Sequence, residues 1–156
     1  MNNFQHQHTA HCESGVMSTM LKAQGVDFNE AMVFGLASAL TFVYIPLVKV
    51  NGMPLISYRM PPKSIIKNVA KRLKVRLKIQ KFRAPQAGQE SLDLALAENK
   101  LVGLQTSVFW LPYFPPEMRF HFNAHNLIVY GKEHNDYLIS DPVFETVQRC
   151  AAEDLQ

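Results

Sequence analysis

Residues 12–24, Cys-Glu-Ser-Gly-Val-Met-Ser-Thr-Met-Leu-Lys-Ala-Gln, are the stretch of this sequence with the clearest local structural signal. The apolar side chains in this stretch recur at the spacing of one helix face, at Val16, Met17, Met20 and Leu21. Gly25 follows, where a glycine commonly ends a helix because it adopts the left-handed conformation at little cost. The pattern predicts a helix over residues 12–24 with Cys12 in its first turn.

The sequence up to residue 73 predicts two more helices and a β-hairpin. Asn29 is a suitable N-cap for a short helix over residues 30–36. Asn51-Gly52 favours a two-residue hairpin turn between strands near 41–50 and 53–58. Pro61-Pro62 starts a helix over about 62–73, because an apolar stripe follows at helical spacing.

The second half of the sequence is dominated by strand patterns. Val75, Leu77 and Ile79 alternate with polar residues, which predicts a half-buried strand. The proline-rich segment 110–116 is predicted to be irregular, because proline fixes its own φ and lacks a backbone N–H donor. The other elements expected here are a loop (83–89), a helix (90–99), a strand (101–106) and two closing strands (125–131 and 136–142). Helices that precede an antiparallel sheet indicate an α+β fold.

Composition indicates one globular domain over residues 1–156. Hydrophobic residues make up 47% of the chain and charged residues 19%, a balance that is atypical of disordered proteins. The two cysteines, Cys12 and Cys150, are too few for a disulfide scaffold or a four-cysteine zinc module, and we expect no metal site. The N-terminus lacks the basic and apolar regions of a secretory signal, which favours a cytoplasmic protein.

Residues 31–48 carry no charged side chain, which raises the question of a membrane span. Gly35 and Pro46 interrupt this stretch, and Phe42-Val43-Tyr44-Ile45 favours a strand. We therefore expect a buried helix followed by a buried strand, and no membrane partner.

Cys12, His125 and Asp141 are the residues in which the sequence suggests a nucleophilic site. Cys12 lies at the predicted start of a helix, where unpaired N–H groups and the helix dipole stabilise a thiolate. His125 opens the first closing strand and Asp141 ends the second, so a hairpin places them nearly opposite each other. An aspartate there orients the imidazole, and the ring takes the thiol proton. The structural alternative is a packed cysteine, a histidine at a strand edge, and an aspartate that ends a strand.

Five separated blocks of the sequence occur in an order that resembles one known family: His11–Gly15, Asn29–Leu36, Trp110–Phe114, Ala124–Gly131 and Ser140–Pro142. Over residues 11–142 the chain resembles the N-terminal domain family of butirosin biosynthesis protein H. That family is similar to papain-like cysteine peptidases and acyltransferases, near the bacteriocin-processing peptidases. The resemblance implies a papain-like fold, in which the helix carrying Cys12 packs on an antiparallel sheet carrying His125 and Asp141. The resembled proteins usually continue into a further C-terminal segment, which we expect this chain to lack.

The resemblance also implies catalytic roles for Cys12, His125 and Asp141 in acyl transfer. The named member of the family moves an acyl group from an acyl carrier protein thioester onto an aminoglycoside amine. By this resemblance, we expect the donor to be a phosphopantetheine thioester on an acidic carrier protein and the acceptor to be a small-molecule amine in specialised metabolite biosynthesis. The chain itself is expected to hold no cofactor. The alternatives are a cysteine peptidase, in which water replaces the amine, and a non-catalytic binding module on the same fold.

Four more residues are candidates for the site. Papain-like enzymes usually carry an oxyanion-binding glutamine six residues before the cysteine, and His6 occupies that position here. Gln5 and Gln7 flank it and are therefore the oxyanion candidates. Trp110 and Tyr113 lie in the stiff aromatic segment before His125, and are candidates for the wall of an acyl-binding cleft.

Residues 63–83 contain nine basic residues and no acidic ones. Such a patch suits an acidic partner, and an acyl carrier protein has that charge. The candidate partner-binding residues are Lys67, Lys71, Arg72, Lys74, Arg76 and Lys78. The alternative is a solvated helix and strand face without a partner. We expect no nucleic-acid partner, because no aromatic residues interleave with the basic ones in a recognition motif.

Overall fold

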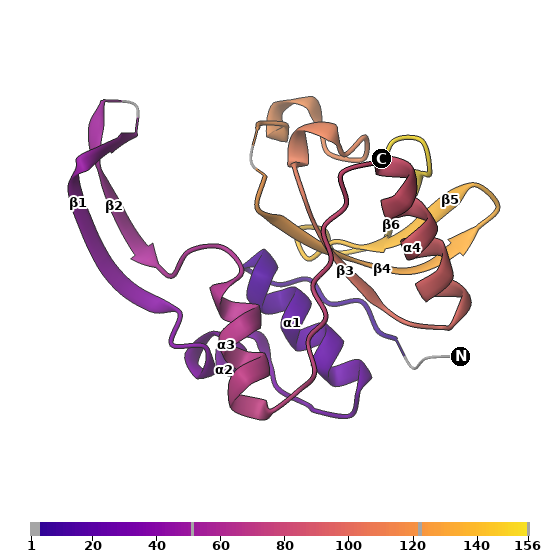
Figure 1. The fold of residues 1–156 in the computed structure, drawn as a ribbon, viewed down its shortest axis with the longest axis horizontal. Coiled ribbons are helices and arrows are strands. Elements are labelled where there is room, and N and C mark those ends of the chain that lie inside the picture. Colours follow the sequence, from indigo (N-terminus) through magenta and orange to yellow (C-terminus); the bar gives the residue numbers. More distant parts are fainter. Residues whose placement is uncertain (1–3, 51, 122, 156) are drawn as a thin grey trace.

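The computed structural model of the protein describes residues 4–50, 52–121 and 123–155, and its helices and strands form two groups (Figure 1). The first group contains helices α1 (Cys12–Ala23), α2 (Glu30–Leu36) and α3 (Ser64–Leu73), and a hairpin of strands β1 (Leu40–Val50) and β2 (Met53–Arg59). The second group contains helix α4 (Pro85–Ala97) and a sheet of strands β3 (Val102–Thr106), β4 (His125–Glu133), β5 (Asp136–Ser140) and β6 (Gln148–Ala151).

The four-stranded sheet has the order β3-β4-β5-β6, and each neighbouring pair is antiparallel. Helix α4 covers one face, where its Leu92 lies in a buried cluster with Leu127 and Val129 of β4. Helix α1 lies on the other face, and its Met20 sulfur is so close to β3 that a Cβ on Gly103 would lie 3.2 Å from it. The predicted α+β class, with the helix that carries Cys12 on an antiparallel sheet, is therefore confirmed.

Helix α1 begins where expected because each of its first residues has a structural partner. The side chain of the N-cap residue His11 accepts a hydrogen bond from the backbone N–H of Ser14. The buried carboxylate of Glu13 accepts from the backbone N–H groups of Lys63 and Ile66, at the N-terminus of α3. A negative charge at that end of a helix is stabilising. These contacts join α1 to α3 and fix the start of α1 at Cys12.

Several other predicted elements are confirmed. The side chain of Asn29 caps α2 by accepting from the N–H of Met32, 2.8 Å away. The closing strands correspond to β4 and β5. The segment 110–116 is irregular only over 111–115, because its two ends belong to the short 3-10 helices Val108–Trp110 and Pro116–Met118. Strand β6, which the sequence pattern did not predict, adds a short fourth strand beyond β5.

The β1–β2 hairpin forms as expected but is not buried. It extends away from the three helices (Figure 1), and Leu47, Leu40 and Met53 are 93%, 77% and 69% exposed. The expectation of a buried strand after α2 is therefore wrong. An uncharged run indicates apolar surface, yet it carries no information about whether the same chain covers that surface. Asn51 of the predicted turn lies outside the described residues.

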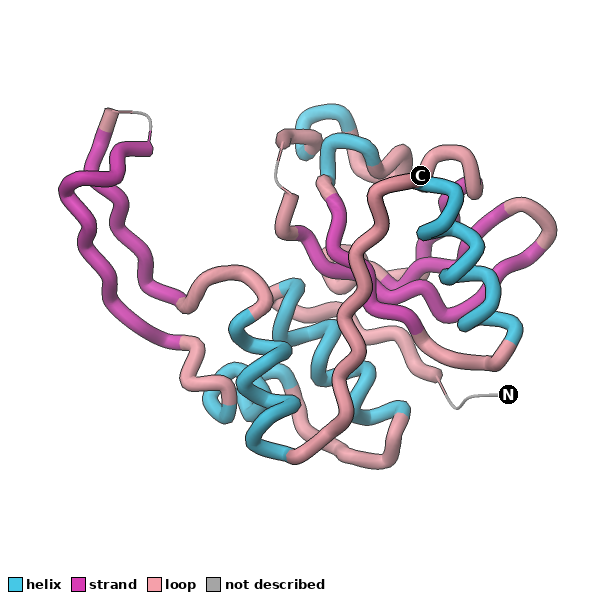
Figure 2. The backbone as a smooth tube through the Cα atoms, viewed as in Figure 1, coloured by secondary structure: helices cyan, strands magenta, loops and turns pink. Residues whose placement is uncertain are grey.

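The connection between α3 and α4 differs from the prediction. Residues 75–79 form no strand, and instead belong to a long irregular segment that crosses between the two groups of elements (Figure 2). Alternating side chains favour an extended backbone, but a strand also needs a partner edge, which the alternation does not encode. Helix α4 starts at Pro85 and not near 90, so the predicted loop over 83–89 is wrong from residue 85 onward. Proline at the first helical position is the signal for this earlier start.

Two helical glycines provide a matched test of the packing around α1. Alanine at Gly15 would place its Cβ 1.8 Å from Thr9 Oγ1, whereas alanine at Gly35 of α2 would meet no atom within 4 Å. We expect Gly15→Ala to lower the free energy of unfolding by about 1–3 kcal/mol through overpacking. Gly35→Ala should raise it by about 0.4–1 kcal/mol, because alanine reduces the entropy of the unfolded chain. Urea unfolding measures both, and equal effects of the two substitutions would contradict this packing.

Candidate active site

Cys12 is the first residue of α1, at the end of the helix that faces the start of β4. Its thiol is free and partly exposed. The Nδ2 atom of Asn126, on β4, lies 3.8 Å from Cys12 Sγ, within hydrogen-bonding range for sulfur. The helix terminus contributes unpaired N–H groups and a partial positive charge beside this sulfur. Both favour the thiolate over the thiol.

His125 and Asp141 form a buried pair beside this sulfur. The Nε2 atom of His125 lies 2.7 Å from Asp141 Oδ2, and the two side chains are 4% and 0% exposed. Asp141 also accepts from the Tyr113 hydroxyl at 2.9 Å and from the Val143 N–H at 3.0 Å. Because Nε2 faces Asp141, Nδ1 is the ring nitrogen left for Cys12, and the ring is near enough to the thiol for each group to shift the pKa of the other. The structure thus brings the three predicted side chains together.

The charges of this group favour a thiolate and an imidazolium. Burial opposes the charge on Cys12, but hydrogen bonds from His125 and Asn126 outweigh it and lower the pKa of the thiol below its usual value. Burial also opposes a charge on His125, but its bonds to Asp141 and Cys12 prevail and raise the pKa of the ring to about 9. Burial beside Asp141 raises the pKa of Tyr113, which therefore stays a neutral donor.

The segment that precedes Cys12 is tied to the loop that contains Asp141. The N–H of Thr9 donates to the carbonyl of Pro142 at 3.0 Å. His6 Nε2 donates to the carbonyl of Phe144 at 3.0 Å, and His6 Nδ1 lies 2.7 Å from the Ser140 hydroxyl. These bonds hold the chain before α1 against the end of β5. They explain how Cys12 and Asp141, far apart in the sequence, come to lie on either side of His125.

The register of the closing strands differs slightly from the expected one. Ile128 pairs with Ser140, so Asp141 lies one residue beyond β5 and not directly opposite His125. The histidine side chain spans this offset, because the distance between its Nε2 atom and Asp141 Oδ2 is still 2.7 Å.

The side chain of Gln7, one of the two oxyanion candidates, is bound away from the Cys12 sulfur. Gln5 is exposed, and Gln7 Oε1 accepts a hydrogen bond from Thr19 Oγ1 at 3.4 Å. Thr19 is seven residues after Cys12 on α1, about 10 Å along the helix axis. Asn126, which the sequence interpretation did not select, is instead the amide at Cys12. Its position next to His125 on a strand was the only available signal.

The aromatic and basic candidates are placed as follows. Tyr113 contacts Asp141 through its hydroxyl, whereas Trp110 is 66% exposed and stacks edge-on against Phe109. The guanidinium of Arg72 donates to Leu36 O and Ser38 Oγ at the end of α2. The six basic candidates are all exposed: Lys67, Lys71, Arg72, Lys74, Arg76 and Lys78.

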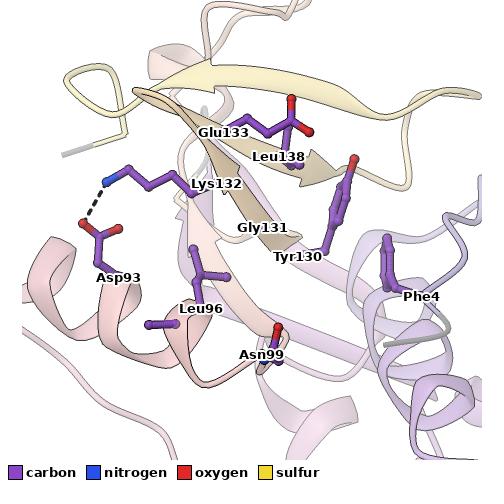
Figure 3. A pocket seen from close by; sticks show the side chains of 10 residues that line it. Phe4, Asp93, Leu96, Asn99, Tyr130, Gly131, Lys132, Glu133 and Leu138 are labelled. Atoms are coloured by element: carbon purple, nitrogen blue, oxygen red, sulfur yellow. Dashed lines mark hydrogen bonds and ion pairs between the residues drawn. The ribbon is translucent and has the colours of Figure 1, made fainter. Parts of the chain in front are cut away.

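A separate pocket of about 790 Å³ lies farther along β4, next to α4 (Figure 3). Phe4 stacks on Tyr130 there with ring centroids 4.7 Å apart, and Lys132 pairs with Asp93 at 2.8 Å. Its lining includes none of Cys12, His125 and Asp141, so this pocket is not part of the cysteine site.

Within residues 4–50, 52–121 and 123–155 there is no group of three or more His, Cys, Asp or Glu side chains arranged to hold a metal ion. No helix in the same ranges has the length and hydropathy needed to span a bilayer.

The family model described as "Butirosin biosynthesis protein H, N-terminal" matches residues 11–142, which include all three residues of the cysteine site. The chain belongs to this family. The match confirms the resemblance seen in the five sequence blocks. Among solved structures, the chain is similar to the peptidase domain of Streptococcus ComA, a bi-functional ABC transporter involved in a quorum-sensing pathway. The sequence identity is 15% and the TM-score 0.48, with 99% of this chain and 90% of that chain covered. None of the curated proteins compared with the sequence matches it.

The two cysteines of this family member should differ in their reaction with iodoacetamide. The thiolate is the reactive form, the pKa of Cys12 is lowered, and burial raises the pKa of Cys150 to about 11. As the pH rises, alkylation of Cys12 should reach its half-maximal rate below the free-thiol value of about 8.5. Cys150 should react only at much higher pH. Peptide mass mapping separates the two sites, and a Cys12 that titrates no earlier than Cys150 would contradict the activation of its thiol.

Asp141→Asn should shift the titration of Cys12, with Cys150 as the internal control. The neutral amide no longer stabilises a charge on His125, so the pKa of the ring should fall and that of the Cys12 thiol should rise. The alkylation profile of Cys12 should therefore move to higher pH, while that of Cys150 should not move.

Proposed function

We propose that this protein is a papain-like cysteine acyltransferase, which moves an acyl or aminoacyl group from a carrier-protein thioester to an amine. The observation that supports this proposal is the buried, hydrogen-bonded pair of His125 and Asp141 beside Cys12, whose thiol pKa is lowered. In the proposed site Cys12 is the nucleophile, His125 the base and Asp141 the carboxylate that orients the base. Membership of the butirosin biosynthesis protein H N-terminal family supports acyl transfer as the reaction.

In the first half of the reaction, Cys12 takes the acyl group. Its thiolate attacks the carbonyl carbon of the donor thioester, and a new bond forms between Sγ and that carbon. The tetrahedral intermediate then expels the phosphopantetheine sulfur, which takes a proton from the His125 imidazolium. The acyl group is left on Cys12 as a thioester, and His125 is left neutral.

In the second half, an amine takes the acyl group from Cys12. The neutral His125 ring accepts a proton from the attacking amine, so that an amide bond forms as the bond between Sγ and the acyl carbon breaks. The Cys12 thiolate and the protonated ring are thereby restored. Asp141 holds the ring throughout, and Tyr113 and the Val143 N–H satisfy the oxygens of that carboxylate.

The carrier protein is proposed to bind at the basic segment 63–83. The side chains of Lys74, Arg76 and Lys78 extend from the irregular connection between α3 and α4 and are exposed. Positive charge on a solvent-facing segment attracts an acidic partner and accelerates its association. Arg72 is less suited to this role, because its guanidinium already binds the C-terminal end of α2.

Intact-mass analysis after incubation with acyl-carrier-protein thioesters tests the proposed reaction. The wild type and Cys150→Ala should each gain one acyl group, whereas Cys12→Ala should gain none. An added amine should discharge the adduct as an amide. An adduct that persists in Cys12→Ala would contradict the mechanism. Discharge only to the free acid, or cleavage of a leader peptide, would instead identify a hydrolase. An unreactive Cys12 would favour a non-catalytic binding module.

Charge reversal of the basic connection tests the carrier-protein surface. Lys74→Glu combined with Arg76→Glu and Lys78→Glu should raise KM for the carrier-protein donor about tenfold or more and weaken its dependence on salt. The turnover number should change little, because these residues are not in the cysteine site. Lys49→Glu on the exposed hairpin is the control, and an equal effect of that variant would contradict a localised docking surface.

A further inference from the structure

The cysteine site requires a donor for the negative oxygen that forms when Cys12 attacks an acyl carbon. As Sγ bonds to that carbon, the π electrons of the carbonyl move to its oxygen, and they return when the leaving group departs. A preorganised N–H donor near the sulfur stabilises this intermediate. This inference rests on the proposed function and concerns the identity of that donor.

The candidate side chains in the segment before Cys12 either have other partners or are exposed. His6 stands at the position usual for the glutamine, and both of its ring nitrogens bind the Asp141 loop, at Ser140 and Phe144. The amide of Gln7 is bound at Thr19, and Gln5 is exposed. The backbone N–H of Cys12, at the first position of α1, has no intrahelical acceptor and is one suitable donor.

Asn126 supplies a side-chain amide at the Cys12 sulfur. Its side chain is 3% exposed, and one Nδ2 hydrogen is used in a bond to the carbonyl of Ala124 at 3.0 Å. The Nδ2 atom also lies 3.8 Å from Cys12 Sγ, a long contact that leaves its second hydrogen directed at the reacting sulfur. The bond to Ala124 fixes the amide in place, so no reorganisation is needed when the oxyanion forms.

Gln105 carries a second side-chain amide, on the strand next to Asn126. It is the direct cross-strand partner of Asn126 in the pairing of β3 with β4, so the two side chains lie on the same face of the sheet. This is the face against which α1 packs, because a Cβ on Gly103, two residues earlier on β3, would point at Val16 and Met20 of that helix. The Nε2 atom of Gln105 is buried and has no hydrogen-bond partner among the described residues. A buried donor without an acceptor costs stability, so the unpaired amide of Gln105 calls for a functional explanation.

We propose that the carboxamides of Asn126 and Gln105, on adjacent strands, are the side-chain donors to the oxyanion of the Cys12 site. They take the place of the glutamine that precedes the cysteine in other papain-like enzymes. Asn126 contacts the sulfur, and Gln105, its cross-strand partner, has a buried N–H without an acceptor among the described residues.

Two reactions of Cys12 distinguish an oxyanion donor at Asn126 from a residue that only supports the structure. Acylation by p-nitrophenyl acetate passes through an oxyanion, whereas alkylation by iodoacetamide does not. Asn126→Ala should slow the acylation step by a factor of about 10²–10³, measured as the burst of nitrophenolate. Alkylation, compared at a pH where the thiolate is fully formed, should keep its wild-type rate. Asn68→Ala is the matched control, because its Nδ2 also donates to a backbone carbonyl at 3.0 Å but lies elsewhere.

Gln105→Leu gives an independent test through stability. It should slow acylation, but it should raise the urea midpoint, because it removes a buried unpaired amide. Acylation at the wild-type rate in Asn126→Ala and Gln105→Leu would overturn the assignment, as would equal losses of acylation and alkylation. A wild type that forms no acyl-enzyme with this ester or with a carrier-protein thioester would overturn the proposed function itself.

Discussion

The hydrogen bond between His125 and Asp141 is the interaction on which the site depends. Asp141 is fully buried, and a buried carboxylate is costly unless its charge and its lone pairs are satisfied. The imidazole, the Tyr113 hydroxyl and the Val143 N–H provide this compensation. Removal of the ring would leave an unpaired buried charge, a loss of about 3–5 kcal/mol in comparable cases. The stability of this part of the fold and the charge of the histidine are therefore linked.

The same carboxylate influences the sulfur through the ring. Asp141 engages Nε2 and stabilises the charged imidazole, so that Nδ1 is the nitrogen left to donate a proton to Cys12. The helix terminus and Asn126 act on the sulfur directly. A thiolate and an imidazolium are thus favoured in a partly buried site, where burial alone would favour two neutral groups.

The first turn of α1 combines structural and chemical functions in adjacent residues. Glu13 binds the N-terminus of α3, and Gly15 leaves room for the side chain of Thr9. Cys12, directly before Glu13, faces Asn126 of the sheet. A cysteine on a helix that is fixed on two sides has little freedom to move. Such rigidity suits the proposed reaction, in which the attacking sulfur must stay aligned with its base and with the oxyanion donors.

The exposed hairpin and the α3–α4 connection show where local patterns mislead. The hairpin turn was readable from Asn51-Gly52, yet its burial was not, since burial depends on which elements cover it. The alternation at residues 75–79 indicated an extended backbone, yet strand pairing requires a partner edge that only the folded chain provides. The early start of α4 is indicated by Pro85, because proline favours the first position of a helix.

The sequence by itself determined the local elements and the chemistry. The apolar spacing of α1, the cap at Asn29 and the alternation of the closing strands depend on neighbours within a few residues, and family blocks pointed to Cys12, His125 and Asp141. Tertiary structure alone decided the contacts between distant segments. Asn126 meets Cys12, Gln105 lies beside Asn126, and His6 binds the Asp141 loop only after α1 has packed on the sheet. No short-range pattern specifies such contacts, because they arise from the packing of elements separated by up to 138 residues.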